Sequence, residues 1–312
     1  MSGSTTQLGA GFEPRSAADW QEKVTKDLKG ADPERLRSKT EDGITVEPLY
    51  TSGNFLQGPP RSKGSVERVS RIGAEANGRI GEAIAFELAH GSDGVLLELS
   101  TPGHSDGLDA EPADWEAVFE GLAEGGALHL RAHTDQLAHA RAWIEASAFG
   151  SRSGVSLGLD PFRTAALTGE FEELEDAVSA AARLAAEAID HPARPRSFDL
   201  DSAPYSGAGA TTAQSVGGLI AALVQVLRSL EEANVDPARA CGTIGLTLRL
   251  DPRFFEQIAA LRALRLLHAQ VVRACGIESD SALHLTALPS ERMLSRRDPW
   301  VNMLRETATS FA

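Results

Sequence analysis

The stretch VSLGLDPFRTAALTGEFEELEDAVSAAARLAAEAIDHPARPRSFDLD, residues 155–201, decides the fold. It begins with an apolar run at 155–160, continues with a helical pattern over 170–189 and ends with a second apolar run at 197–201. A strand, a helix of ten or more residues and another strand need a crossover connection, which makes the two strands parallel and places the helix on one face. The stretch therefore predicts one βαβ unit.

The same unit recurs on both sides of this stretch. The expected strands are 94–100, 127–132, 155–160, 197–201, 243–250 and 282–288, and the expected helices are 78–89, 113–123, 135–147, 170–189, 212–233, 252–275 and 298–311. We expect a seventh, short strand at 107–109, where the connection after the first strand is long. The repeat predicts an α/β fold of the (β/α)8 TIM-barrel type whose eighth strand is missing from this chain. An open doubly wound sheet is the alternative, but no Gly-x-Gly-x-x-Gly follows the first strand.

Composition narrows the class of protein. The chain has 312 residues with 44 acidic and 30 basic side chains, and its net charge of −14 disfavours binding to nucleic acid or an anionic membrane. The apolar run 216–227 is interrupted by Gln225 and is shorter than the ~20 residues of a membrane span. Cys241 and Cys275 lie among apolar neighbours, and no secretory signal precedes the chain, so we expect free buried thiols and a cytoplasmic location.

The carboxyl ends of the strands are the places to look for chemistry in a barrel. The segment 205–212, YSGAGATT, could present backbone N–H groups to an anion, or it could be a tight turn capped by Thr211 or Thr212. Arg163 follows another strand and is either a ligand-binding cation or a solvated loop charge. His129 and His133 lie on a strand and at its end, where a four-residue spacing does not converge on a metal, so we expect no metal site.

The segment 20–51, ahead of the repeat, predicts an arm made of a helix and an extended part. Trp20, Val24 and Leu28 form an apolar stripe on a helix that Asp19 could cap and Gly30 could end. The part around 44–49 alternates like a strand. The arm is too short to bury its own apolar side chains. We expect subunit contacts from Trp20, Leu28, Ile44, Leu49 and Tyr50.

The arm resembles the amino-terminal arm of methylmalonyl-CoA mutase subunits. The resemblance rests on Trp20, Lys23-Val24, Leu28-Lys29-Gly30, Leu36 and Thr40-x-Asp42-Gly43-Ile44-x-Val46-x-Pro48-Leu49-Tyr50-Thr51, and it resumes at Arg297-Asp298-Pro299-Trp300-Val301-Asn302-Met303-Leu304-Arg305. It implies a (β/α)8 barrel that threads acyl-CoA along its axis, a separate domain for adenosylcobalamin, and a dimer in which each arm embraces its neighbour. We accordingly expect two parts, an arm at 1–58 and a barrel at 59–312 that is truncated before the last strand, with no cobalamin domain.

The positions that the resemblance marks as catalytic differ here. Tyr205 and Gly209-Ala210-Thr211 are kept, but Ser206 stands where catalytic chains have the histidine that bonds the thioester carbonyl. The segment 68–73, RVSRIG, lacks the tyrosine that catalytic chains carry just before the first strand. We expect no catalytic residue in this chain, with Tyr205, Ser206 and Arg163 as weak candidates for substrate contact.

These differences predict a subunit of an adenosylcobalamin-dependent methylmalonyl-CoA mutase, namely the small non-catalytic one. Its partner would be a catalytic chain that interconverts methylmalonyl-CoA and succinyl-CoA, and the cofactor would act through the assembled enzyme, since no Asp-x-His-x-x-Gly motif occurs in residues 1–312. Two alternatives remain open. One is a homodimeric acyl-CoA mutase whose pocket reads another acid through Arg163 and Ser206, and the other is a structural barrel with no link to cobalamin.

Overall fold

The computed structural model describes residues 11–13, 15–51, 66–99, 107–108, 115–122, 125–132, 134–146, 154–277 and 283–311. By its internal contacts the chain divides into two compact units, Met1–Gln57 and Gly58–Ala312. The boundary expected at 58/59 lies in the segment 52–65, outside the described residues.

The first unit contains one helix and a small hairpin. Helix α1 (Ala17–Asp27) begins at Ser16, whose hydroxyl accepts from the Asp19 N–H while the Asp19 carboxylate accepts from the Ser16 N–H. Asp19 is therefore the third residue of a capping box rather than the cap itself, which corrects the prediction. After a 3-10 turn, η1 (Pro33–Leu36), strands β1 (Ser38–Lys39) and β2 (Thr45–Val46) pair antiparallel. Gly30 follows the helix with φ +91°, as a helix-ending glycine does.

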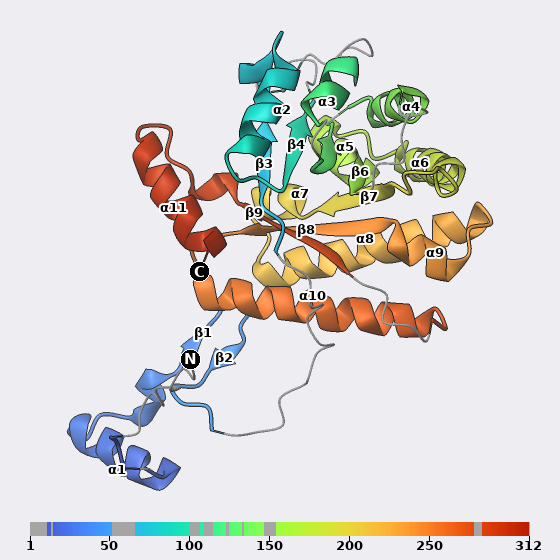
Figure 1. The fold of residues 1–312 in the computed structure, drawn as a ribbon. Coiled ribbons are helices and arrows are strands. Elements are labelled where there is room, and N and C mark those ends of the chain that lie inside the picture. The colour runs from blue at the N-terminus through green and yellow to red at the C-terminus, as the bar shows by residue number, and fades with distance from the viewer. Residues whose placement is uncertain are drawn as a thin grey trace, which may run out of the picture. The chain divides into compact units, whose positions relative to one another are not determined.

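The second unit is built on one curled parallel sheet of seven strands in sequential order, which agrees with an incomplete (β/α) barrel (Figure 1). The strands are β3 (Val69–Ile72), β4 (Gly94–Glu98), β5 (Ala127–Arg131), β6 (Val155–Leu159), β7 (Arg196–Asp201), β8 (Ile244–Leu250) and β9 (His284–Pro289). Each strand pairs in parallel with the next one along the chain, so no strand order changes and the doubly wound alternative is wrong.

The first strand of the barrel differs from the prediction. Residues 107–109 were expected to supply a short strand, but Leu108 makes only a single parallel bridge to Leu99. The strand lies earlier, in β3, which pairs with β4 from Val69↔Gly94 onward. The sequence VSRI hides this strand because Ser70 and Arg71 interrupt the apolar pattern.

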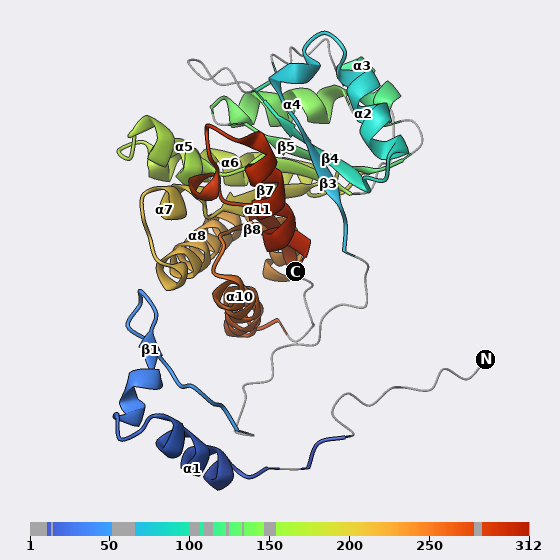
Figure 2. The ribbon, with the colours of Figure 1, turned by 90° about the vertical axis from the view of Figure 1, so that its left-hand side faces the viewer.

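Six helices of the repeat lie along the convex face of the curled sheet (Figure 2). They are α2 (Ile80–Ala89), α3 (Trp115–Gly121), α4 (Gln136–Ala146), α6 (Leu174–Ala188), α8 (Thr212–Glu232) and α10 (Phe254–Ala274). The last helix, α11 (Pro299–Phe311), lies beside β9 (Figure 1). One hydrophobic core joins the sheet to the six helices of the convex face, and Phe198 and Leu200 of β7 are fully buried in it. Helix α8 is long and apolar enough to cross a membrane by length and composition, but half of its apolar window is buried within this barrel.

Three short helices were missed by the sequence analysis. Helices α5 (Pro161–Thr168), α7 (Ala203–Gly207) and α9 (Pro237–Gly242) each follow the end of a strand or helix. Helix α5 carries clear boundary signals, because Asp160 caps it, proline is its first residue and Gly169 ends it with φ +80°. Its eight residues were too few for a periodic pattern to be recognised.

Candidate functional site

The concave side of the sheet is polar, because the residues between the core positions point inward. On β7, Phe198 and Leu200 join the core, while Asp199 and Asp201 point to the other face and bond to the neighbouring strand β8. At the carboxyl ends of the strands this face gathers one layer of charged side chains: Arg71, Glu98, Arg131, Asp160, Arg163, Asp201 and Arg249. This layer is the candidate functional site.

Glu98, the last residue of β4, occupies one half of the layer. Its Oε2 lies 3.3 Å from Nε of Arg71 and 3.4 Å from Nη1 of Arg131, and its Oε1 lies 3.4 Å from Nη2 of Arg163. The side chains of Glu98, Arg131 and Arg163 are less than a tenth exposed. Arg71 is 55% exposed, so the layer meets solvent at that residue.

Asp201, the last residue of β7, occupies the other half. Its carboxylate binds the Arg249 guanidinium at 2.7 and 2.9 Å and lies 3.4 Å from Arg131. Burial alone would raise the pKa of Asp201, but Arg249 and Arg131 outweigh that effect and hold the pKa well below its usual range. In the same way, Asp201 keeps the pKa of the buried Arg249 above its usual range although burial alone would lower it. This pair is therefore fully ionised at neutral pH.

Asp160 connects the layer to the backbone. Its carboxylate accepts from the N–H groups of Arg163 (3.1 Å) and Asp201 (2.8 Å), and its own N–H and C=O are bound by the buried amide of Gln136. Burial raises the pKa of Asp160 to about 7, even though these N–H groups and Arg163 act in the opposite direction. Burial, followed by the nearby Arg131, lowers the pKa of Arg163 to about 10.

Arg163 therefore does not lie where a solvated loop charge would. It is 3% exposed, it belongs to α5, and its guanidinium faces Glu98. The interpretation of Arg163 as a solvated loop charge is wrong, because its side chain is buried; its role as a cation that binds a ligand stays a prediction.

Tyr205 and Ser206 lie beside this layer, on α7. The Ser206 hydroxyl donates to the Ala203 carbonyl of its own helix at 3.5 Å, and Arg292 donates to the Ser206 carbonyl at 2.9 Å. Burial, and then the nearby Asp160, raise the pKa of Tyr205 to about 12, so the phenol stays protonated. Thr211 caps α8 in a capping box with Gln214, which confirms Thr211 as the cap, but residues 205–207 of the expected turn belong to helix α7.

A second polar cluster lies at the opposite, amino-terminal end of the strands. Arg196 donates to Nδ1 of His129 (3.1 Å), and Nε2 of His129 lies 3.2 Å from a Glu67 carboxylate oxygen. Because arginine can only donate, Nδ1 must accept, and His129 is the neutral tautomer whose Nε2–H donates to Glu67. Arg196 also contacts Asp199, which accepts from Thr247. Among the described residues there is no group of three or more histidine, cysteine or acidic side chains that could hold a metal, and His133 lies outside them.

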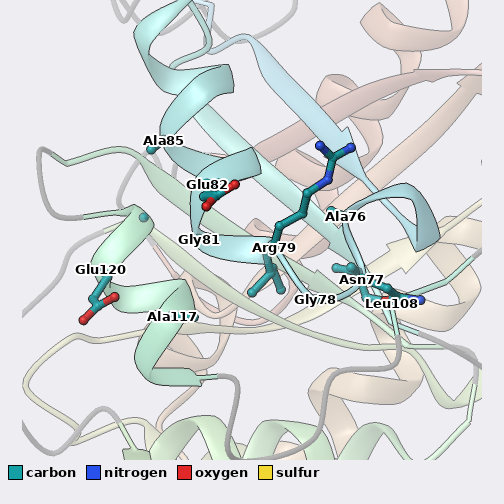
Figure 3. Close-up of a pocket in the computed structure, with 12 residues that line it drawn as sticks. Ala76, Asn77, Gly78, Arg79, Gly81, Glu82, Ala85, Leu108, Ala117 and Glu120 are labelled. Carbon is teal, nitrogen blue, oxygen red and sulfur yellow. The ribbon is translucent and has the colours of Figure 1, made fainter.

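A surface hollow of about 490 Å³ lies apart from both clusters, between the start of α2 and α3 (Figure 3). Arg79, Glu82 and Glu120 bring charge to it, Asn77 adds a polar amide, and its other lining residues are glycine, alanine, isoleucine and leucine. Neither Arg163 nor Tyr205 nor Ser206 lines it. The helices approach closely here, because a Cβ on Gly121 would lie 2.6 Å from the Gly81 carbonyl oxygen.

The arm exposes the side chains that were expected to contact another surface. Helix α1 has no buried residue, and Trp20 and Leu28 are only half-buried. Ile44, Leu49 and Tyr50 are 59%, 41% and 61% exposed. Of the two thiols, Cys241 is buried as expected, but Cys275 is exposed at the end of α10, which corrects the prediction for that residue.

Comparison with known proteins agrees with this architecture. The family model described as Methylmalonyl-CoA mutase matches residues 166–312. A methylmalonyl-CoA mutase small subunit from Streptomyces virginiae is 31% identical over 96% of this chain and 52% of its own length. The chain belongs to the methylmalonyl-CoA mutase family. A probable small subunit from Mycobacterium bovis is 30% identical over 90% of this chain and 48% of its own length. The small subunit of Propionibacterium freudenreichii subsp. shermanii is 26% identical over 99% of this chain and 52% of its own length.

The chain thus spans about half the length of the curated relatives it matches. In a mutase-family barrel the strand ends are the expected place for chemistry, and the sequence analysis examined them, but it missed Glu98, Arg131, Asp201 and Arg249 as one layer. The sequence does contain a pattern that indicates this layer. On β5, β7 and β8 every second residue near the end is charged or polar, as in His129 and Arg131 or Asp199 and Asp201. Such alternation in strands that are otherwise apolar indicates a polar barrel interior.

Proposed function

We propose that this chain is the arm and barrel portion of the small, non-catalytic subunit of an adenosylcobalamin-dependent methylmalonyl-CoA mutase. The arm would be residues 1–58, and the barrel 59–312 would stop before its eighth strand. The partner would be a catalytic chain that interconverts methylmalonyl-CoA and succinyl-CoA in the cytoplasm. The names of the relatives, each a methylmalonyl-CoA mutase small subunit or a probable one, support this proposal.

The observation that carries the non-catalytic part is the charged layer. Arg163 is the cation best placed to read a substrate acid, but its guanidinium is buried and faces Glu98. Ser206 directs its hydroxyl to its own helix, and the Asp201–Arg249 pair lies beside it at the end of the sheet. Catalysis needs donors aimed at the charge that develops in the transition state. Here the charged groups neutralise one another instead.

We place adenosylcobalamin on the partner chain rather than on residues 1–312. Adenosylcobalamin supplies radical chemistry when it is bound to an enzyme. The chain lacks the Asp-x-His-x-x-Gly motif, and both ring nitrogens of His129 are occupied by Glu67 and Arg196.

Titration of the purified chain with methylmalonyl-CoA tests the non-catalytic proposal. We expect no saturable binding by calorimetry and no turnover with adenosylcobalamin. Ser206→His should restore neither, because the arginine and tyrosine that act together with that histidine are still missing and such groups are not additive. The same titration of a catalytic mutase chain is the positive control. Tight stoichiometric binding of the acyl-CoA would favour the homodimeric enzyme with an altered pocket.

We propose in addition that the arm is an intermolecular clasp. If several hundred Å² of apolar surface from Trp20, Leu28, Ile44 and Leu49 become buried, the area rule gives roughly 5–10 kcal/mol before the cost of association. Deleting residues 1–51 should then abolish co-purification with a catalytic chain, whereas deleting residues 1–10 should not. Undiminished complex formation after the longer deletion would exclude the clasp.

A further inference from the structure

Asn77 and Gly78 are the central residues of the tight turn between β3 and α2. Asn77 has φ −55° and ψ 129°, Gly78 has φ +76°, and the Arg79 N–H donates to the Ala76 carbonyl at 3.0 Å. These values define a type II turn, whose third residue is normally glycine. Both central residues are exposed, whereas Ala76 before them and Ile80 after them are buried. The core therefore holds both ends of a turn whose centre meets solvent in the wall of the surface hollow (Figure 3).

An asparagine followed by glycine can react with the backbone nitrogen of that glycine, which is one reason why asparagine is thermolabile. The Gly78 nitrogen attacks Cγ of Asn77, the Cγ–Nδ2 bond breaks, and the amide proton of Gly78 leaves with Nδ2 as ammonia. The product is a five-membered succinimide. Water then opens the ring at Cγ, which gives aspartate, or at the main-chain carbonyl carbon, which gives isoaspartate. Either route replaces a neutral amide by a carboxylate and consumes only water.

The turn leaves the attacking nitrogen accessible. No atom lies within 4 Å of the position that a Cβ on Gly78 would occupy, and glycine itself brings no side chain to obstruct the ring. Among the described residues, the Gly78 N–H has no backbone acceptor. The reaction at this turn therefore needs neither the removal of a neighbouring side chain nor the opening of a helix or strand.

The other asparagines of the chain have different surroundings. Three occur besides Asn77, and none of them is followed by glycine. Asn234 precedes Val235, whose N–H donates to the Leu230 carbonyl at 2.9 Å. Asn302 lies inside α11, and its side-chain amide bonds to the backbone of Ser295 at 2.6 and 2.8 Å. Asn54 lies outside the described residues.

We propose that Asn77–Gly78 is a site of spontaneous modification, at which the folded chain converts Asn77 to aspartate and isoaspartate. The hollow beside the turn is lined by one arginine and two glutamates, so the new carboxylate is its third acid. Isoaspartate also lengthens the backbone of the turn by one methylene group. Because Ala76 and Ile80 are held in the core, the isoaspartyl turn loses the bond from Arg79 to Ala76 and loosens the start of α2. The isoaspartyl carboxylate is the group that a protein isoaspartate methyltransferase esterifies.

Incubation of the purified 1–312 chain in mildly alkaline buffer tests the proposal. Trypsin cleaves after Arg71 and Arg79 and releases residues 72–79, a peptide in which Asn77 is the only asparagine. We expect this peptide to gain the mass that replacement of –NH2 by –OH brings, and the intact chain to gain one negative charge on isoelectric focusing. Isoaspartate methyltransferase with labelled S-adenosylmethionine should label the same peptide. Mildly acidic buffer should slow the conversion, because the attacking nitrogen must lose its proton.

Asn77→Gln is the matched control. It keeps the amide and the charge, but its longer side chain would have to form a six-membered ring, so this variant should show no conversion over the same time. Conversion at Asn234 and Asn302 in the wild type should be slower by roughly tenfold or more, because their surroundings must first open locally.

The chain unfolded in urea provides the reference rate. If residues 72–79 stay unmodified in the folded chain after the unfolded chain has converted, the fold protects this turn and the proposal is wrong. Equal conversion at Asn77 and Asn234 would also overturn it. These measurements use neither coenzyme nor partner, so their outcome is independent of the proposed mutase role.

Discussion

Replacing Asp201 by Asn should destabilise the chain strongly although the side chain keeps its shape. The Asp201 carboxylate is 1% exposed and binds Arg249 at 2.7 and 2.9 Å, with Arg131 at 3.4 Å. Removing one partner of a buried pair leaves an uncompensated charge and costs about 3–5 kcal/mol. We expect Asp201→Asn to lower the free energy of unfolding by that amount. The assay is urea denaturation of the full chain at pH 7.5, followed by circular dichroism.

A double-mutant cycle tests the reason for this loss. Adding Arg249→Met to Asp201→Asn removes the orphaned charge, so the double variant should be more stable than Asp201→Asn alone. Asp190→Asn is the matched control, because Asp190 pairs with Arg239 on the surface and its loss should cost less than about 1 kcal/mol. A cost below about 1 kcal/mol for Asp201→Asn, or a double variant that loses the sum of both single losses, would refute the argument.

Two further predictions concern neighbouring positions. Burial raises the pKa of Asp160 from 3.8 to about 7, so the stability it contributes is fully present below about pH 4 and is lost as the pH rises through about 7. Relative to Asp160→Asn, the wild type should therefore lose up to about 1.4 kcal/mol of unfolding free energy per pH unit between pH 5 and 7. If urea titrations at several pH values gave the same difference in unfolding free energy between the two proteins, this prediction would be contradicted. Gly158 has φ +67°, and an added Cβ would lie 1.8 Å from the Leu130 carbonyl oxygen, so Gly158→Ala should cost at least about 3 kcal/mol. Gly217→Ala, in an open part of α8, should instead stabilise by about 0.5–1 kcal/mol in the same assay; equal effects of the two substitutions would disprove the steric argument.

Most of the architecture could be predicted from the sequence, because the signals for it are local. In strands such as β6 and β8 every second residue is valine, isoleucine or leucine, and helices such as α6 and α8 repeat their apolar residues at helical spacing. Strand β3 could not be recognised, because an arginine faces the concave side at a position where the pattern expects an apolar residue. The pairing of β3 with β4 decides its conformation, and such pairing is invisible in a single local window.

The candidate site could be located but not assembled. Its position at the strand ends follows from the fold class, and Arg163 was identified there. The connection of Arg163 to Glu98 spans 65 residues of sequence, and that of Arg249 to Asp201 spans 48. Such pairs form because the curled sheet brings the strand ends together. The sequence therefore indicated which charges exist but not which of them neutralise one another.

The curled sheet also has a consequence for handling the protein. Among the described strands, β3 and β9 each have a neighbour on one side only. The backbone N–H and C=O groups on the other side of an edge strand can pair with a strand of another molecule. Arg71 on β3 provides a gatekeeper charge, but β9, with the sequence HLTALP, has no lysine, arginine, aspartate or glutamate to discourage intermolecular strand addition. Concentrated preparations of residues 1–312 should therefore aggregate through β9 first, and a single lysine on its exposed face is the substitution expected to keep them dispersed.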